Sequence, residues 1–266
     1  MKNKRITAVF VLAILFIFTF FSYDIPSPVH ATGPRWLFVV VGQSNAVLMC
    51  NPGTILAQTE AAQYFPNLPD SIAAYYSNVD TLTICAAVSG SDIASWQPDA
   101  TGPTTPTPTA NNFHAAVNQV LTAKANGYIV KAIIFSQGEA DASGWNNTVA
   151  PDYWTVQAAN FLDAFRVAIG DQYVPVIYTE LGDKPDYRPA GTPSPNGNNT
   201  NPYANWETIR KSQHELRYNR ANFFMVDKQP FDAYRSGAPW VHNTPVSLQA
   251  IKDQIMIYLR GWVPKP

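Results

Sequence analysis

Five short apolar segments recur along the chain and predict the strands of a sheet. The first, residues 36–41, contains only aromatic and aliphatic side chains and is followed by Gly42. A continuous apolar run that is rich in β-branched residues is typical of a strand buried on both faces, as in a parallel sheet. The other four segments are residues 81–88, 130–135, 174–179 and 222–226. We therefore expect a sheet of five buried strands.

Segments with helical periodicity lie between these runs. One helix is expected to start at Asn111 or Asn112, whose side chain can cap it, and to end before Gly127. Three further helices are expected at residues 153–169, 206–218 and 247–259. Because strands that alternate with helices form βαβ units, the pattern predicts an α/β fold with a mainly parallel sheet and helices on both faces.

The first thirty-one residues have the pattern of a secretory signal peptide. A basic start at residues 1–5 is followed by the apolar residues 6–21 and by small residues that end at Ala31. The apolar stretch is shorter than the ~20 residues that a membrane-spanning helix needs, which disfavours a stable anchor. We therefore expect cleavage after Ala31, a secreted or periplasmic location, and a single mature domain of residues 32–266.

Composition excludes some functions and leaves one structural question open. The 18 basic and 19 acidic residues are nearly balanced, so nothing indicates binding to nucleic acid. The two cysteines, Cys50 and Cys85, lack the CxxC spacing and the neighbouring histidines of a structural zinc site. Export would permit a disulfide, but Cys85 lies in an apolar run where a buried free thiol is equally expected. Their pairing therefore stays open.

Polar residues suited to acyl transfer follow the predicted strands. Because the carboxyl ends of parallel strands meet at one edge of the sheet, these residues are expected to lie close together. A serine hydrolase needs a nucleophile, a base, a group that orients the base, and donors for the oxyanion. The candidates, in chain order, are Ser44, Gly90, Gln137, Glu139, Glu180 and His242. The sequence thus predicts a serine hydrolase site at this edge.

The base is chosen among four histidines. His30 belongs to the signal peptide, and His114 and His214 lie in predicted helices, where packing or surface roles are expected. His242 lies in a loop just before the last helix. We therefore assign the role of general base to His242.

Taken together, these motifs resemble the SGNH hydrolases, and within them the branch of sialate O-acetylesterases and acetyl xylan esterases. The blocks that carry the resemblance are Gly42–Asn45, Ser89–Ser91 with Trp96, Gln137–Asp141, Glu180–Asp183 and His242. The resemblance spans nearly all of the mature chain. It implies a three-layer α/β/α sandwich of the SGNH or flavodoxin-like type.

The resemblance also assigns roles to individual residues. It implies that Ser44 is the nucleophile, and that the oxyanion hole consists of the N–H groups of Ser44 and Gly90 and the side-chain amide of Gln137. Three neighbouring residues are expected to support the site: Gln43, Asn45 and Glu139. The resemblance implies no metal ion and no organic cofactor.

One position departs from the family pattern. Much of the family has an aspartate three residues before the catalytic histidine, and this chain has Pro239 there. A proline side chain cannot accept a hydrogen bond from His242, so another carboxylate replaces the aspartate or the site works as a dyad. We choose Glu180 as the replacement because it ends a predicted strand at the active edge and because related esterases with a similar segment use a glutamate. Glu139 is the second choice and Asp232 the third.

The expected function is the removal of O-acetyl groups from an acetylated oligo- or polysaccharide. One alternative is an unselective SGNH esterase that acts on short-chain or aryl esters. A second is a carbohydrate-binding relative without turnover, which Pro239 and the aromatic, asparagine-rich loops would suit. The identity of the sugar stays open, because loops such as residues 101–108 and 188–203 would shape its pocket.

Overall fold

The structure is a computed structural model in which a five-stranded parallel sheet forms the centre of the fold. It describes residues 33–51, 67–99, 112–143, 153–182, 205–218, 220–227, 243 and 245–265. Residues Pro34–Pro266 form one compact unit. The strands are β1 (Arg35–Gly42), β2 (Asp80–Cys85), β3 (Ile129–Ser136), β4 (Val176–Thr179) and β5 (Phe223–Val226), in the order β2-β1-β3-β4-β5. The expected signal peptide and its cleavage point lie outside the described residues.

All five predicted strands are confirmed, with two differences at their ends. Residues 86–88 do not continue β2, although Ala86 and Val88 still donate backbone hydrogen bonds to β1. At the start of β4, the Val174 N–H turns back to the carbonyl of Asp171, and Pro175 has no N–H to donate. Local hydrogen bonding at the strand ends therefore set boundaries that the apolar pattern could not.

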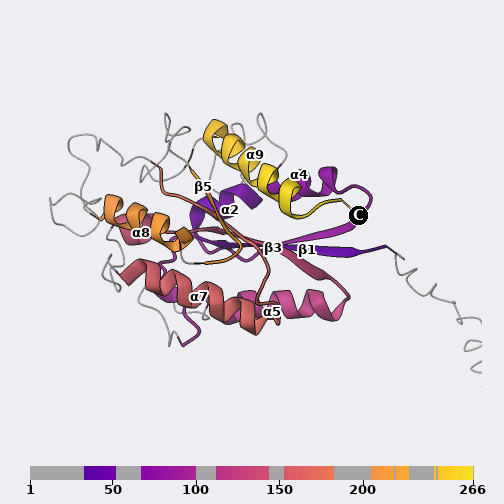
Figure 1. Cartoon of the computed structure of the whole chain (residues 1–266), viewed down its shortest axis with the longest axis horizontal. Coiled ribbons are helices and arrows are strands. Elements are labelled where there is room, and N and C mark those ends of the chain that lie inside the picture. Colours follow the sequence, from indigo (N-terminus) through magenta and orange to yellow (C-terminus); the bar gives the residue numbers. More distant parts are fainter. Residues whose placement is uncertain are drawn as a thin grey trace, which may run out of the picture. The chain divides into compact units, whose positions relative to one another are not determined.

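Helices cover both faces of the sheet, which confirms the three-layer sandwich (Figure 1). Alternate side chains of β1 point to opposite faces: Leu37 belongs to the apolar core on one side and Phe38 to the core on the other. The first core is closed by α5 (Asn112–Ala125), α7 (Trp154–Ala168) and α8 (Trp206–Tyr218). The second is closed by α2 (Ser44–Cys50), α4 (Leu68–Tyr75) and α9 (Pro245–Trp262). No helix in the described part of the chain is both long and apolar enough to cross a membrane.

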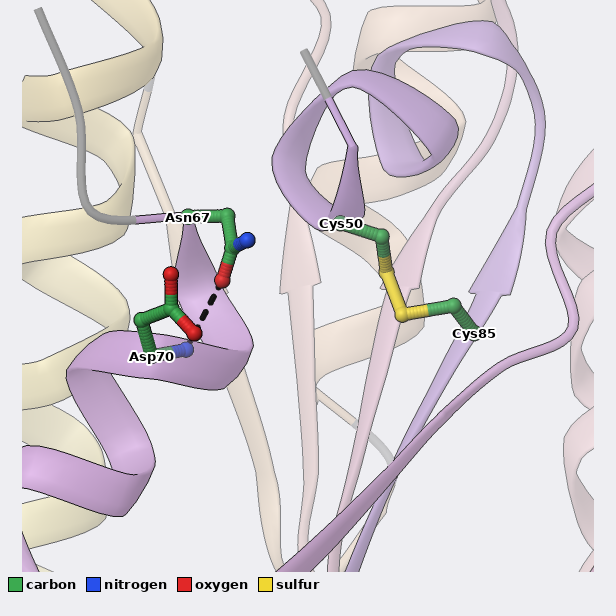
Figure 2. Close-up of a disulfide and its surroundings, with 4 residues drawn as sticks. All are labelled: Cys50, Asn67, Asp70 and Cys85. Atoms are coloured by element: carbon green, nitrogen blue, oxygen red, sulfur yellow. Dashed lines mark hydrogen bonds between the residues drawn. A yellow bond between two sulfur atoms is a disulfide. The ribbon is translucent and has the colours of Figure 1, made fainter. Parts of the chain in front are cut away.

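Helix α4 was not among the expected elements. Its first turn is capped by Asn67, whose side-chain oxygen accepts a hydrogen bond from the Asp70 N–H at 2.8 Å (Figure 2). Leu68 and Ile72 bury its apolar side against the sheet. The capping asparagine is visible in the sequence, but two buried positions in eight residues give too weak a periodicity to predict a helix.

A disulfide joins Cys50 to Cys85 and answers the question that the sequence left open (Figure 2). Their Cα atoms are 6.2 Å apart, within the usual range for a disulfide. Cys50 is the last residue of α2 and Cys85 the last residue of β2. The bridge therefore ties the helix that begins at Ser44 to the neighbouring strand.

The strand order has a topological switch point between β1 and β3. The chain moves from β1 to β2 on one side, and β3, β4 and β5 lie on the other, so the direction reverses between β1 and β3. In open α/β sheets, ligands bind at such a switch point, beyond the carboxyl ends of the strands. Gly42 and Ser136, at the ends of β1 and β3, are partners in register there.

Candidate active site

The turn after β1 presents Ser44 at the switch point. Gly42 has φ of 123°, and a Cβ atom on it would lie 1.9 Å from the carbonyl oxygen of Ser136. The next residue, Gln43, donates its N–H to the same oxygen at 2.9 Å. Only glycine permits this close approach, because a side chain would overlap the backbone of β3. Ser44 then begins α2 and has 4% of its surface exposed.

Both neighbours of Ser44 bind the segment that follows β3. The side-chain oxygen of Gln43 accepts the N–H of Ala140 at 3.1 Å. Asn45 donates from Nδ2 to Oε1 of Glu139 at 2.5 Å. Glu139 and Ala140 open the short helix α6 (Glu139–Ser143), and all of these side chains are buried. The structure thus brings the three expected supporting residues together beside Ser44.

The loop after β2 carries Gly90 on the surface of this edge. Its φ of 73° is a left-handed conformation that favours glycine, and a Cβ atom there would meet no heavy atom within 4 Å. The next residue, Ser91, donates its hydroxyl to the carbonyl of Val88 and accepts the indole N–H of Trp96 at 3.0 Å. The buried Trp96 therefore holds the loop in place while Gly90 stays exposed.

Gln137 extends from the end of β3 toward the same loop. Its Nε2 donates to the carbonyl of Ser91 at 2.9 Å, and its Oε1 accepts the N–H of Gly138. From α8, Gln213 donates to the backbone carbonyl of Gln137 at 2.8 Å. An amide nitrogen carries two hydrogens, and the second has no acceptor among the residues that the structure describes. This N–H is the one that an oxyanion could use.

Asp141, which ends the Gln137–Asp141 block, is a buried carboxyl. Both of its oxygens accept the backbone N–H of Ile93, at 3.2 and 3.3 Å, so it ties α6 to the loop after β2. Burial raises its pKa to about 8, and the nearby carboxylate of Asp92 adds to the rise. Asp141 is therefore mostly protonated at neutral pH and adds no full charge beside the site.

Glu180 follows β4 and is bound from α8. It is fully buried, and its Oε1 lies 2.5 Å from Nε2 of His214 and 3.5 Å from Nε of Arg210. The pKa of Glu180 is raised to about 7, chiefly by burial and also by the carboxyl of Asp227, while His214 opposes both effects. We call Glu180, Arg210, His214 and Asp227 the Glu180 cluster.

The contact between Glu180 and His214 was not expected from the sequence, which indicated a packing or surface role for His214. The side chain of His214 is 43% exposed on its outer side. Arg210 and His214 are four residues apart on α8 and so lie on one face of the helix. That spacing was a usable signal, but it does not say which strand the face meets.

Three of the candidate residues, His242, Pro239 and Asp232, lie outside the described residues. The residue after His242 is described: Asn243 is buried, and its N–H donates to Oδ1 of Asn45 at 3.1 Å. Thus the chain next to His242 in sequence contacts the residue next to Ser44.

The sequence analysis also predicted no metal ion and no cofactor. Across the described ranges, no group of three or more histidine, cysteine, aspartate or glutamate side chains is placed to hold a metal ion.

Comparison with known families gives one match, which covers more than half of the chain. Residues 69–247 match the family described as carbohydrate esterase, sialic acid-specific acetylesterase. The matched range contains Gly90, Gln137, Glu180 and His242, and Ser44 precedes it. No curated protein matches the sequence.

Solved structures share the fold at low sequence identity. A protein from Arabidopsis thaliana aligns with a TM-score of 0.60 at 13% identity, over 86% of this chain and 99% of its own. A carbohydrate acetylesterase from Xanthomonas citri aligns with a TM-score of 0.54 at 14% identity, over 85% of this chain and 56% of its own. Est24, a carbohydrate acetylesterase from Sinorhizobium meliloti, has a TM-score of 0.52 at 14% identity, over 84% and 99%. These likenesses show the fold.

The family match, the α/β/α sandwich and the convergence of three strand-end loops around Ser44 agree with one another. The chain therefore belongs to the sialic acid-specific acetylesterase family of carbohydrate esterases, which are carboxylic ester hydrolases of the SGNH type.

Proposed function

We propose that the protein is an exported serine esterase that removes O-acetyl groups from an acetylated oligo- or polysaccharide. The observation that carries the proposal is the hydrogen-bonded assembly around Ser44. The loops after β1, β2 and β3 meet there through Gln43, Asn45 and Gln137. This assembly supplies a serine at the switch point and amide donors beside it, which is what acyl transfer needs.

The proposed reaction proceeds through an acetylated serine. His242 takes the proton of the Ser44 hydroxyl, and the Ser44 oxygen attacks the carbonyl carbon of the acetyl group. The N–H groups of Ser44 and Gly90 and the second N–H of Gln137 stabilise the negative oxygen. The C–O bond to the sugar breaks, and His242 protonates the departing hydroxyl. A water molecule, deprotonated by His242, then attacks the acetyl-serine and releases acetate.

The choice of His242 as base is supported by its sequence neighbour. Asn243 donates its backbone N–H to Asn45, and Asn45 directly follows Ser44. A general base must come within hydrogen-bond reach of the nucleophile. Because the backbone is anchored to Asn45 one residue after His242, it supports a position of His242 close to Ser44.

Glu180 remains our proposal for the carboxylate that orients His242. Its Oε1 is bound by His214, so the interaction with His242 would use Oε2, which is buried and accepts no hydrogen bond from a described donor, with the carboxyl of Asp227 as another neighbour of Glu180. If His214 and Arg210 instead account for the whole role of Glu180, then Glu139 or Asp232 orients His242 or the site works as a Ser44–His242 dyad. Substitution of Glu180 distinguishes the first arrangement from these alternatives.

Export is supported by two observations. The first thirty-one residues have the pattern of a signal peptide, and Cys50 and Cys85 form a disulfide. Disulfides persist in oxidising compartments and are rare in the cytosol. Amino-terminal sequencing of the protein recovered from the culture medium or periplasm tests the proposal, and a protein found only in the cytosol with Met1 intact would contradict it.

The function is tested by acetate release from residues 32–266. The substrates are acetylated xylan, an O-acetylated sialoside and a simple aryl acetate. We expect release from at least one acetylated carbohydrate, and loss of that release in Ser44→Ala and in His242→Ala. His114→Ala is the matched control for the histidine, because His114 is exposed on α5, where its Nε2 lies 3.0 Å from the carbonyl oxygen of Pro98.

A second candidate function is a carbohydrate-binding protein without turnover, because Pro239 stands where much of the family has the aspartate that orients the histidine. That candidate predicts binding to the polysaccharide that Ser44→Ala leaves unchanged, with no acetate released by the unaltered protein. An unselective esterase would instead hydrolyse the aryl acetate and spare the acetylated carbohydrates.

A further inference from the structure

Asn45 makes two hydrogen bonds that run in opposite directions. Its amide nitrogen donates to Oε1 of Glu139 at 2.5 Å, and its amide oxygen accepts the N–H of Asn243 at 3.1 Å. The first bond reaches the segment after β3 and the second reaches a residue 198 positions away, just before α9. Asn45 therefore connects three separate parts of the chain through one planar group.

The direction of the Asn45 amide is determined by its partners. A glutamate carboxylate accepts and does not donate, so it binds the nitrogen end of the amide. A backbone N–H donates and does not accept, so it binds the oxygen end. Since Asn45 is 1% exposed and Glu139 2% exposed, water does not compete freely for these bonds. A flipped amide would lose both.

The anchored residue, Asn243, is adjacent to His242 in the chain. We propose that Asn45, oriented by Glu139, is a positioning residue that holds the backbone at Asn243 and thereby sets the distance between His242 and Ser44. This inference rests on the proposed function, in which His242 is the base. It extends that function by naming what holds the base in place.

The positioning role of Asn45 matters more in this chain because Pro239 cannot orient His242. In much of the family, an aspartate three residues before the catalytic histidine orients the histidine ring. This chain has proline at that position, so position 239 offers no carboxylate. The bond from Asn243 to Asn45 acts on the main chain instead. Misplacement of a catalytic group by about 1 Å can cost about 100-fold in rate, so a main-chain anchor can contribute strongly to kcat.

The test exchanges donor and acceptor across the Asn45–Glu139 pair. Asn45→Asp keeps an oxygen for the Asn243 N–H but removes the donor to Glu139 and places two carboxyl groups together. Glu139→Gln supplies a donor amide at the other side. In the double variant, the Gln nitrogen donates to the Asp carboxylate, and the Asp still accepts from Asn243.

We expect kcat for acetate release to fall about 100-fold in Asn45→Asp, with KM changed much less. Glu139→Gln alone should lower kcat less than about tenfold, because its amide oxygen can still accept from Asn45. The double variant should recover most of the loss. Asn45→Ala should be slow, and adding Glu139→Gln to it should not help, because no group remains to bind Asn243.

Melting temperatures and near-UV circular dichroism of every variant separate positioning from folding. Asn118→Asp, on the exposed face of α5, is the matched control for the chemical change and should keep the kcat of the unaltered protein. A folded Asn45→Asp with unchanged kcat overturns the proposal. So does a folded double variant that is as slow as Asn45→Ala. If Asn45→Asp alone does not fold, the kcat of the double variant decides in the same way.

Failure of this inference can be told from failure of the proposed function. If the unaltered protein releases no acetate, or Ser44→Ala releases it normally, the proposed function itself is wrong. If release depends on Ser44 and His242 but is indifferent to Asn45→Asp, only the positioning role is wrong.

Discussion

The surroundings of Ser44 and the Glu180 cluster both lie at the carboxyl edge of the sheet, but different forces hold them. Around Ser44, amide side chains and backbone groups make directed hydrogen bonds between loops. In the Glu180 cluster, a buried carboxyl meets an imidazole and a guanidinium from α8. Hydrogen bonds between amide and backbone groups keep their geometry over a broad pH range, whereas the charge of the Glu180 carboxyl changes near neutrality.

This difference suggests a division of labour between the two regions. Transition-state stabilisation needs donors that do not move as charge develops, and in the proposed mechanism the loops around Ser44 supply such donors. The Glu180 cluster connects β4 and α8, and in the proposed mechanism it acts on His242 through the remaining oxygen of Glu180. The following predictions test how separate the two regions are.

The largest effect is expected from Ser44→Ala. Loss of the nucleophile should lower kcat by at least about 10⁴-fold, while the melting temperature changes little because only one oxygen atom is removed. Steady-state acetate release and a thermal melt measure both. Ser71→Ala, which removes a hydroxyl from α4, is the control and should keep full activity. Comparable rates in the two variants would exclude Ser44 as nucleophile.

The next effect separates the triad from the dyad. Glu180→Gln should lower kcat by up to about 10⁴-fold if Glu180 orients His242, because loss of an orienting acid has this cost in serine hydrolases. His214→Ala breaks only the contact within the Glu180 cluster and should lower kcat far less. Equal, small losses of kcat in both variants would show that the cluster serves the fold and that the site is a dyad or uses Glu139 or Asp232 as its acid.

The disulfide should matter for stability more than for chemistry. Cys50 and Cys85 are 35 positions apart. A disulfide that closes a loop of this length restricts the unfolded chain, so its removal is expected to lower the free energy of unfolding by about 4 kcal/mol. We expect this loss of stability in Cys50→Ser/Cys85→Ser, measured by urea denaturation, because the double variant no longer links α2 to β2. A double variant with unchanged stability would mean that hydrogen bonds alone hold the Ser44 loops.

The smallest effect concerns the pH dependence of stability. The pKa of Asp141 is raised to about 8 in the folded protein from an ordinary value near 3.8. Between these values the folded protein binds one more proton than the unfolded chain, so the contribution of Asp141 to stability falls as the pH rises. Asp141→Asn, which mimics the protonated acid, should therefore gain stability relative to the unaltered protein from pH 5 to pH 8, by at least about 1 kcal/mol.

Urea denaturation at pH 5, 6.5 and 8 measures this difference. Asp253→Asn, at an exposed position of α9, provides the matched control for the chemical change. A difference between Asp141→Asn and the unaltered protein that stays constant from pH 5 to pH 8 would contradict the assignment of a protonated Asp141.

The apolar pattern was sufficient for most of the fold because the central strands β1, β3 and β4 are largely buried on both faces, although the edge strand β2 is mostly half-buried. Runs such as residues 36–41 carry that burial in their composition, and the five strands were found where expected. The ends of β2 and β4 were less predictable, since they depend on hydrogen bonds to β1 and on Pro175. Helix α4 was missed because its stability comes from a cap and two buried positions instead of a long periodic face.

For the site, the sequence by itself determined which residue types follow each strand, and so placed Ser44, Gly90 and Gln137 at one edge. Parallel strands make this inference general, because their carboxyl ends must meet. Only the tertiary structure decided which side chains pair across that edge: Asn45 with Glu139, and Glu180 with His214. Such pairs join segments far apart in the chain, and their partners are selected by how α6 and α8 pack on the sheet, which no local pattern encodes.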